Sequence, residues 1–248
     1  MDKQSDLTVH EFTITKKALM DIDERERMFF VLLGFVCNEI IILNKIALSI
    51  DVFNRESEGI EKKAYAVQGN FIARLLIAKT FEAWEKLFRK LFFKSQLKRM
   101  YEPCLSDKAK LALADLGKFF AENGYVATLR NQYTFHYPSD ELSAAMPDIP
   151  DDEVWKIYLS DTHGNSLYYL SEMIAGHAML AEVDPDVATA FGKIIADRDF
   201  VARGMIVLST GCMNVFVKRH LGLSLTDGTP ITIKVPELLS VKLPFFTG

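Results

Sequence analysis

The sequence predicts a mainly α-helical fold, a helical bundle with one small β-hairpin insertion. Long stretches repeat their apolar residues at helical spacing, and prolines and glycines separate these stretches. Hydrophobic residues make up 49% and charged residues 25% of the chain, as is typical of a folded globular protein. Because the 248 residues contain no internal repeat and no flexible linker, we expect a single domain over 1–248 with its bundle core at about 24–220.

The N-terminal part predicts a short strand or arm followed by a central helix. Apolar and polar residues alternate at 7–15, within a polar segment over 1–20. The helical pattern begins at about Asp23, with Asp21 or Asp23 as the cap. At 28–48 this helix is apolar around most of its circumference, so we expect it to be buried. Polar residues interrupt the apolar stretch, so we do not expect it to span a membrane.

A long second helix is expected at 60–100. Its apolar residues keep helical spacing, and Pro103 ends it. A helix of this length would extend about 60 Å at 1.5 Å per residue. We therefore expect a break in it, near Gly69 or Asn70.

Two shorter helices follow, separated by turn residues. Ser106 caps a third helix at 106–124, which is expected to end at a glycine. A fourth helix at 125–137 stops at Pro138. A loop with three prolines is expected at 138–152.

The C-terminal part combines a hairpin with further helix. Aromatic, β-prone arms flank turn residues at 153–172, which predicts the β-hairpin insertion. Helical patterns cover 172–183 and then 184–220, the latter as one long helix or two, and Gly222 ends it. The proline-broken tail from residue 229 has an extended pattern, and we expect it to pack across the bundle.

Composition excludes several classes of function. The net charge of −4 argues against a protein that coats nucleic acid through bulk charge. The three cysteines lie far apart with no CxxC pair, and no phosphate-binding glycine loop, HExxH or GxSxG motif is present. We therefore expect no disulfide framework, no metal and no cofactor. The N-terminal residues lack the apolar run of a secretory signal, so we expect a cytoplasmic protein without membrane attachment.

The segment LRNQYTFHYP holds the residues best suited to catalysis, namely Arg130, Asn131 and His136. Arginine is permanently charged and binds phosphate oxygens through two parallel hydrogen bonds. Histidine titrates near neutral pH and can accept or donate a proton, and a helix C-terminus favours its protonated form. Asparagine can orient the histidine or hydrogen-bond a phosphate or a ribose. These residue types fit a phosphodiester substrate.

This segment resembles the motif of the HEPN family (higher eukaryotes and prokaryotes nucleotide-binding domain). The family motif is an arginine, a polar residue directly after it, and a histidine following four to six intervening residues. The resemblance covers about 24–220, with the specific match at 130–136. It implies a HEPN-like helical bundle and a metal-independent endoribonuclease whose products carry 2′,3′-cyclic phosphate and 5′-hydroxyl ends. In that reaction His136 would move the proton, Arg130 would stabilise the charged phosphorane and Asn131 would position them.

The resemblance also implies a homodimer, because HEPN sites usually form at a two-fold interface with one motif from each protomer. RNA would be the substrate, in stress response or defence. A toxin-type subgroup, which pairs with a nucleotidyltransferase, carries a tyrosine two positions after the histidine. Pro138 stands at that position here, which does not support this pairing, and the sequence identifies no cognate inhibitor.

A second candidate surface is a basic stripe formed by Lys86, Lys90 and Lys94, at every fourth residue of the expected second helix. Such a stripe could follow an RNA backbone. Glu82 precedes Lys86 by four residues, which is the favourable direction for a helical ion pair. A solvated helix face is therefore the competing interpretation.

Two other functions stay open. A HEPN-like protein can be a non-catalytic binding or scaffold protein, in which Arg130 and His136 form a structural pair. Alternatively, the chain is an unrelated helical bundle in which the motif arose by chance. RNA turnover that is lost when His136 is replaced would exclude the scaffold.

Overall fold

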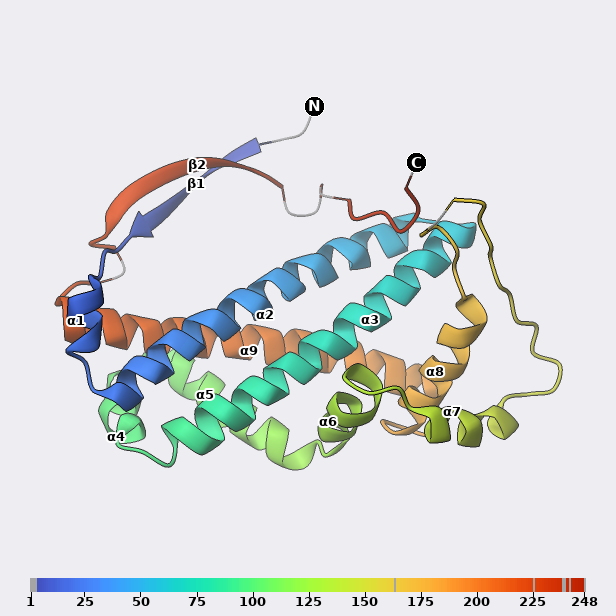
Figure 1. Cartoon of the computed structure of the whole chain (residues 1–248), viewed down its shortest axis with the longest axis horizontal. Helices are drawn as coiled ribbons and strands as arrows, with labels where there is room; N and C mark the ends of the chain where they lie inside the picture. Colours follow the sequence, from blue (N-terminus) through green and yellow to red (C-terminus); the bar gives the residue numbers. More distant parts are fainter. Residues whose placement is uncertain (1–3, 163, 225, 238–239, 241, 248) are drawn as a thin grey trace. The chain divides into compact units, whose positions relative to one another are not determined.

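The computed structural model describes residues 4–162, 164–224, 226–237, 240 and 242–247. This described part contains nine α-helices and one two-stranded antiparallel sheet, which confirms the mainly α prediction (Figure 1). The three longest helices are α2 (Glu24–Glu56), α3 (Gly59–Ala83) and α9 (Val187–Leu221). Contacts divide the chain into two compact units, and each of these three helices contributes residues to both.

The first unit comprises residues 1–42, 79–122 and 201–240. It holds the start of α2, the end of α3 and the C-terminal part of α9. Its other elements are, in chain order, β1 (Gln4–Glu11), α1 (Lys16–Met20), the π-helix η1 (Trp84–Phe92), α4 (Leu97–Tyr101), the 3-10 helix η2 (Glu102–Cys104), α5 (Asp107–Glu122) and β2 (Thr229–Pro236).

Aromatic side chains build the core of the first unit. Phe29 of α2 lies edge-on to Phe88 and Tyr101, with ring centroids 6.0 and 5.7 Å apart. The ring of Phe92 lies 5.5 Å from that of Phe29, and all four side chains are buried. Such aromatic pairs add about 0.5–1.5 kcal/mol each beyond the apolar area that they bury. The cluster therefore holds α2, η1 and α4 together.

Helix α2 begins where the sequence predicts. Asp23 caps it, because its Oδ1 accepts hydrogen bonds from the backbone N–H groups of Arg25 and Glu26 at 3.0 and 3.3 Å.

The expectation that this apolar helix, α2, is buried is wrong for one side of it. Five large apolar side chains of this helix are exposed, namely Met28, Val31, Leu32, Phe35 and Ile42. An apolar sequence indicates that a helix needs packing partners. It does not show how much of the helix circumference those partners cover in the folded chain. Within the described residues, α2 and α9 are both long and apolar enough to cross a bilayer, by length and composition alone.

The sheet joins the two ends of the chain. β1 and β2 pair antiparallel, from Gln4 opposite Pro236 to Glu11 opposite Thr229. The N-terminal strand is thus confirmed, whereas the expectation that the tail packs across the bundle is wrong for 229–236. An extended segment must find partners for its backbone N–H and C=O groups, and a second extended segment supplies them in regular register.

The second unit comprises residues 43–78, 123–200 and 241–248, of which the structure describes all but 163, 241 and 248. It holds the remaining parts of α2, α3 and α9. Its other elements are α6 (Tyr125–Thr128), the π-helix η3 (Leu129–Thr134), α7 (Ser139–Ala145), the 3-10 helix η4 (Met146–Asp148) and α8 (Tyr169–Ala181).

The predicted break of the second helix near Gly69 or Asn70 is wrong, since α3 continues to Ala83. A Cβ atom at Gly69 would lie 3.4 Å from Cγ2 of the buried Ile50, so the glycine allows α2 and α3 to approach each other closely. The chain leaves the helical path later, in the turn at 93–96 that follows η1.

The predicted β-hairpin at 153–172 is also wrong in its extent. One antiparallel bridge joins Tyr158 and Leu167, with N–H···O distances of 2.9 and 2.7 Å, and the second arm then enters α8. Residue 163, at the predicted turn, lies outside the described residues. A two-stranded hairpin needs a further strand or a helix against one face to be stable. The predicted loop at 138–152 is wrong too, because it contains α7 and η4.

Other predicted helix boundaries are confirmed. Ser106 caps α5, with its Oγ accepting from the backbone N–H of Ala109 at 3.3 Å. α9 is one continuous helix, and Gly222 follows its last residue with φ +68°, a conformation that favours glycine.

Two glycines of α9 provide a matched test of helix packing. A Cβ atom at Gly211 would lie 2.5 Å from Cβ of Ala109, whereas one at Gly192 would meet no atom within 4 Å. We expect Gly211→Ala to lower the free energy of unfolding by about 1–3 kcal/mol through overpacking. Gly192→Ala is expected to raise it by up to about 1 kcal/mol through helix propensity. Urea denaturation measures both, and equal effects of the two substitutions would contradict the close contact between α5 and α9.

Candidate functional site

The motif residues lie where a short α-helix becomes a π-helix. α6 passes directly into η3, a π-helical segment whose backbone hydrogen bonds span five residues. Leu129 and Tyr133 are buried and anchor this segment. Thr134 closes it by donating a hydrogen bond from Oγ1 to the carbonyl oxygen of Leu129 at 2.9 Å. π-Helical turns are rare and frequently occur at functional sites.

Arg130 contacts the side chains of Asn131 and Phe135. Its Nη1 donates a hydrogen bond to Oδ1 of Asn131 at 2.7 Å, and its guanidinium carbon lies 5.6 Å from the ring centroid of Phe135. Arg130 is half-buried and Asn131 is exposed. Because Asn131 uses its carbonyl oxygen on the guanidinium, it orients the arginine in this structure.

His136 lies just beyond the helix. η3 ends at Thr134, and Phe135 has φ −110° and ψ −5°, which turns the backbone away from the helical path. His136 is exposed on the bend that follows. The predicted helix at 125–137 therefore ends three residues early, because a residue that precedes a proline, here Tyr137, disfavours helical geometry.

The buried side chain of Tyr133 lies within the same π-helical segment as Arg130. Burial, followed by the charges of Glu182 and Glu141, raises the pKa of Tyr133 to about 12. Tyr133 therefore stays protonated at neutral pH and adds no negative charge beside Arg130. The carboxylates of Glu182 and Glu141 lie near enough to Tyr133 to raise this pKa, and their charge opposes the binding of an anion there.

The basic stripe is partly engaged in ion pairs along its own helix. Nζ of Lys86 lies 3.7 Å from the Glu82 carboxylate, and Nη1 of Arg89 lies 2.7 Å from that of Glu85. These are the pairs that a solvated helix face would form, and each contributes about 0.3–0.5 kcal/mol. Lys90 is exposed on the same segment.

Lys94 belongs to a different surface, which we name the basic cavity. This cavity of the first unit has a volume of about 400 Å³. Four cationic side chains line it together with Phe93, Ser95 and Gln96, and these four are Arg25, Lys94, Lys98 and Arg99. The sequence shows three of these cations in one short stretch, but Arg25 comes from the start of α2 and no local pattern indicates it.

A buried carboxylate lies next to the basic cavity. Oε1 of Glu26 accepts hydrogen bonds from Oη of Tyr101 at 2.8 Å and Nε of Arg219 at 3.3 Å, and it contacts Nε2 of His220 at 2.9 Å. Glu26 and Arg219 also line a cavity of about 450 Å³ that shares Arg25 with the basic cavity. Burial, followed by the hydrogen bond to Glu26, raises the pKa of Tyr101. Sequence analysis misses this network because its members are far apart along the chain.

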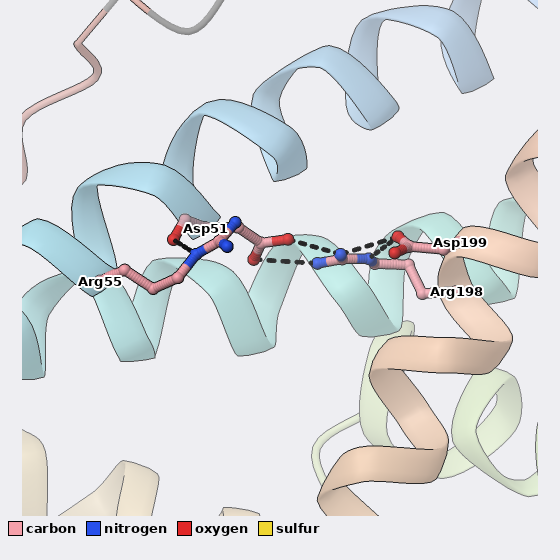
Figure 2. A network of polar contacts seen from close by, with 4 residues as sticks. All are labelled: Asp51, Arg55, Arg198 and Asp199. Atoms are coloured by element: carbon pink, nitrogen blue, oxygen red, sulfur yellow. Dashed lines mark hydrogen bonds and ion pairs between the residues drawn. The ribbon is translucent and has the colours of Figure 1, made fainter.

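A second buried network lies in the second unit (Figure 2). Arg198 of α9 is buried and donates to the two carboxylate oxygens of Asp51 at 3.2 and 2.6 Å, and to Oδ1 of Asp199 at 2.9 and 2.7 Å. Nε of Arg55 donates to the backbone carbonyl oxygen of Asp51 at 3.1 Å. Burial lowers the pKa of Arg198, but the hydrogen bonds to Asp51 and Asp199 raise it by more, so Arg198 is charged. This network was not predicted either.

Neither a metal site nor a known relative indicates the function of these residues. Within the part of the chain that the structure describes, no three His, Cys, Asp or Glu side chains are grouped so that they could hold a metal ion. Comparison with protein-family models, with curated proteins and with solved structures gives no match to this chain. The function is therefore inferred from the residues themselves.

Proposed function

We propose that this chain is a metal-independent RNA endonuclease of the HEPN type. The observation that supports this most strongly is the arrangement of the motif at the end of η3. Asn131 holds Arg130 at 2.7 Å, and His136 is exposed on the adjoining bend. An oriented guanidinium suits a phosphate, and an exposed imidazole six residues later in the chain suits proton transfer.

In the proposed reaction the ribose 2′-oxygen attacks the adjacent phosphorus atom. The 2′-O–P bond forms and the P–O5′ bond breaks, which gives a 2′,3′-cyclic phosphate and a 5′-hydroxyl. His136 accepts the proton of the 2′-hydroxyl, and Arg130 stabilises the additional negative charge of the phosphorane. A second acid must protonate the leaving 5′-oxygen, and we assign this role to His136 of a second copy in a homodimer with a composite site.

The exposed setting of the motif suits a polymeric substrate. Asn131 and His136 are both exposed, and Tyr137 is fully exposed, so a long RNA strand can reach them without a lid having to open. Separately, the basic cavity of the first unit would bind backbone phosphates of an RNA through its four cations.

The test is RNA cleavage by the purified full chain on total cellular RNA in the presence of EDTA. We expect fragments with 2′,3′-cyclic phosphate ends, which poly(A) polymerase cannot extend until the cyclic phosphate is removed. Cleavage that EDTA prevents would contradict the metal-independent reaction. An absence of cleavage on every RNA class tested would favour the non-catalytic scaffold.

The basic cavity gives a separate prediction about binding. Lys94→Glu combined with Arg99→Glu is expected to weaken RNA binding at least about tenfold and to reduce the dependence of log K on log salt by about 1.4, at about 0.7 per phosphate contact. Fluorescence anisotropy with a labelled single strand at several salt concentrations measures both. The control is Lys108→Glu with Lys110→Glu, which reverses two exposed lysines on α5 outside the cavity. An equal loss in both double variants would contradict a role of the cavity.

A further inference from the structure

The first unit carries a β-ribbon, which we define as the paired strands β1 and β2, with one apolar face. In the antiparallel register Leu7 lies opposite Ile233 and Val9 opposite Ile231, so these four side chains share a face. They are 39–47% exposed. Among the residues that the structure describes, the strands pair only with each other (Figure 1), and a two-stranded sheet of this kind is marginally stable in water. The ribbon therefore needs a surface to cover its apolar face.

The same unit carries a second uncovered apolar surface on α2, which we name the α2 stripe. It consists of the exposed apolar residues of this helix. Three of them, Met28, Phe35 and Ile42, follow each other at intervals of seven residues, and Val31 and Leu32 lie between the first two. At 100° per residue all five fall within about 100° of the helix circumference, as in the seam of a coiled coil. They are 38–62% exposed.

We propose that the ribbon of one copy of this chain packs on the α2 stripe of a second copy, and reciprocally, in a two-fold homodimer. A sheet face over an apolar helix face is the ordinary way in which these elements form a layer. Both halves of the contact are present on one chain and both remain exposed in it, so a second copy supplies each missing partner. A reciprocal contact closes with two-fold symmetry and leaves no unpaired surface.

The exposed apolar area matches the requirement of a dimer. For residues with areas on the order of 200 Å², the exposed fractions of the nine side chains correspond to roughly 800 Å² per copy. This is about what one partner of a standard protein–protein interface buries.

The polar groups within these surfaces favour a protein partner over a lipid bilayer. Glu39, between Phe35 and Ile42 on the stripe, forms an ion pair with Lys79 at 3.0 Å. Placing this pair in a bilayer core would cost several kcal/mol. On the opposite face of the ribbon Asp6 lies across from Lys234, and these charges would form the solvated outer side of the layer.

The first measurement is the mass of the full chain by size exclusion with light scattering. We expect a dimer for the wild type. Phe35→Asp, and separately Leu7→Lys with Ile233→Glu, are each expected to give monomers with an unchanged circular dichroism spectrum. Leu111→Asp is the matched control, because Leu111 is 62% exposed on α5 and lies outside both surfaces, so the dimer should persist.

A crosslinking experiment tests which surfaces meet. Val9→Cys and Val31→Cys proteins, each also carrying Cys104→Ser to remove the exposed native thiol, are mixed and oxidised. We expect a disulfide-linked pair that contains one copy of each protein. A monomeric wild type would overturn the proposal, and so would a dimer that the ribbon variant leaves intact, because α2 would then pair with α2. If the protein stayed monomeric and floated with phospholipid vesicles, the α2 stripe would be a membrane-binding surface and the proposal would be wrong. This interface uses surfaces of the first unit alone and goes beyond the proposed function. A monomeric wild type would also contradict the composite site, whereas a dimer that the ribbon variant leaves intact would contradict this interface alone.

Discussion

Replacing His136 with alanine is expected to reduce the rate of RNA cleavage by about 10²- to 10⁴-fold, the usual contribution of a general acid or base. The melting temperature should stay within about 1 °C of the wild type, because the side chain is exposed and its removal leaves no cavity. Initial rates from a gel assay with EDTA, together with thermal unfolding of the same samples, measure both quantities.

Two further variants separate catalysis from a local disturbance of the bend. Tyr137→Phe changes the fully exposed neighbour of His136 and is expected to leave the cleavage rate unchanged. Arg130→Lys keeps the charge but loses the planar group that binds phosphate and Asn131, so it is expected to lose most of the activity. A His136→Ala rate within twofold of the wild type would contradict the proposed function and would leave the scaffold as the better interpretation.

Replacing Arg198 with alanine is expected to lower the free energy of unfolding by about 3–5 kcal/mol. The substitution removes a buried guanidinium that makes four hydrogen bonds to Asp51 and Asp199, and it leaves a cavity between helices of the second unit (Figure 2). The half-buried carboxylate of Asp51 would lose two of its hydrogen bonds. Urea denaturation at constant pH measures the change.

Arg55→Ala provides the matched control in the same cluster. Arg55 is exposed and makes a hydrogen bond to the backbone carbonyl of Asp51, so its loss is expected to cost less than about 0.5 kcal/mol. Asp51→Asn removes one charge but keeps a hydrogen-bond acceptor, and it should cost about 1–3 kcal/mol. If Arg198→Ala and Arg55→Ala had similar effects, the ion pair would not stabilise the second unit.

The local elements of the fold follow from the sequence because their causes are local. Asp23 and Ser106 cap helices because a short side-chain oxygen reaches the N–H groups of the next turn. Gly222 ends α9 because it adopts a positive φ. Residues 130–136 could be selected as the candidate site because the types and the spacing of their side chains are visible in one short segment.

The predictions that failed depended on distant partners. The hairpin at 153–172 has β-prone arms, yet a single bridge joins them and the second arm then enters α8. The tail pairs instead with β1, more than 200 residues away in the chain. Gly69 does not break the helix but allows a close contact between α3 and α2. This contact depends on Ile50 of α2, which the local sequence around Gly69 does not indicate.

The sequence by itself determined the helical class, most helix boundaries, and the three residue types on which the proposed chemistry rests. Only the tertiary structure decided which side chains meet. It placed Arg25 beside Lys94, Lys98 and Arg99 in the basic cavity, and it buried Glu26 and Arg198 with partners from distant segments. It also left one side of α2 exposed. Helix propensity and capping act over a few residues, whereas burial and ion pairing depend on which segments the folded chain brings together.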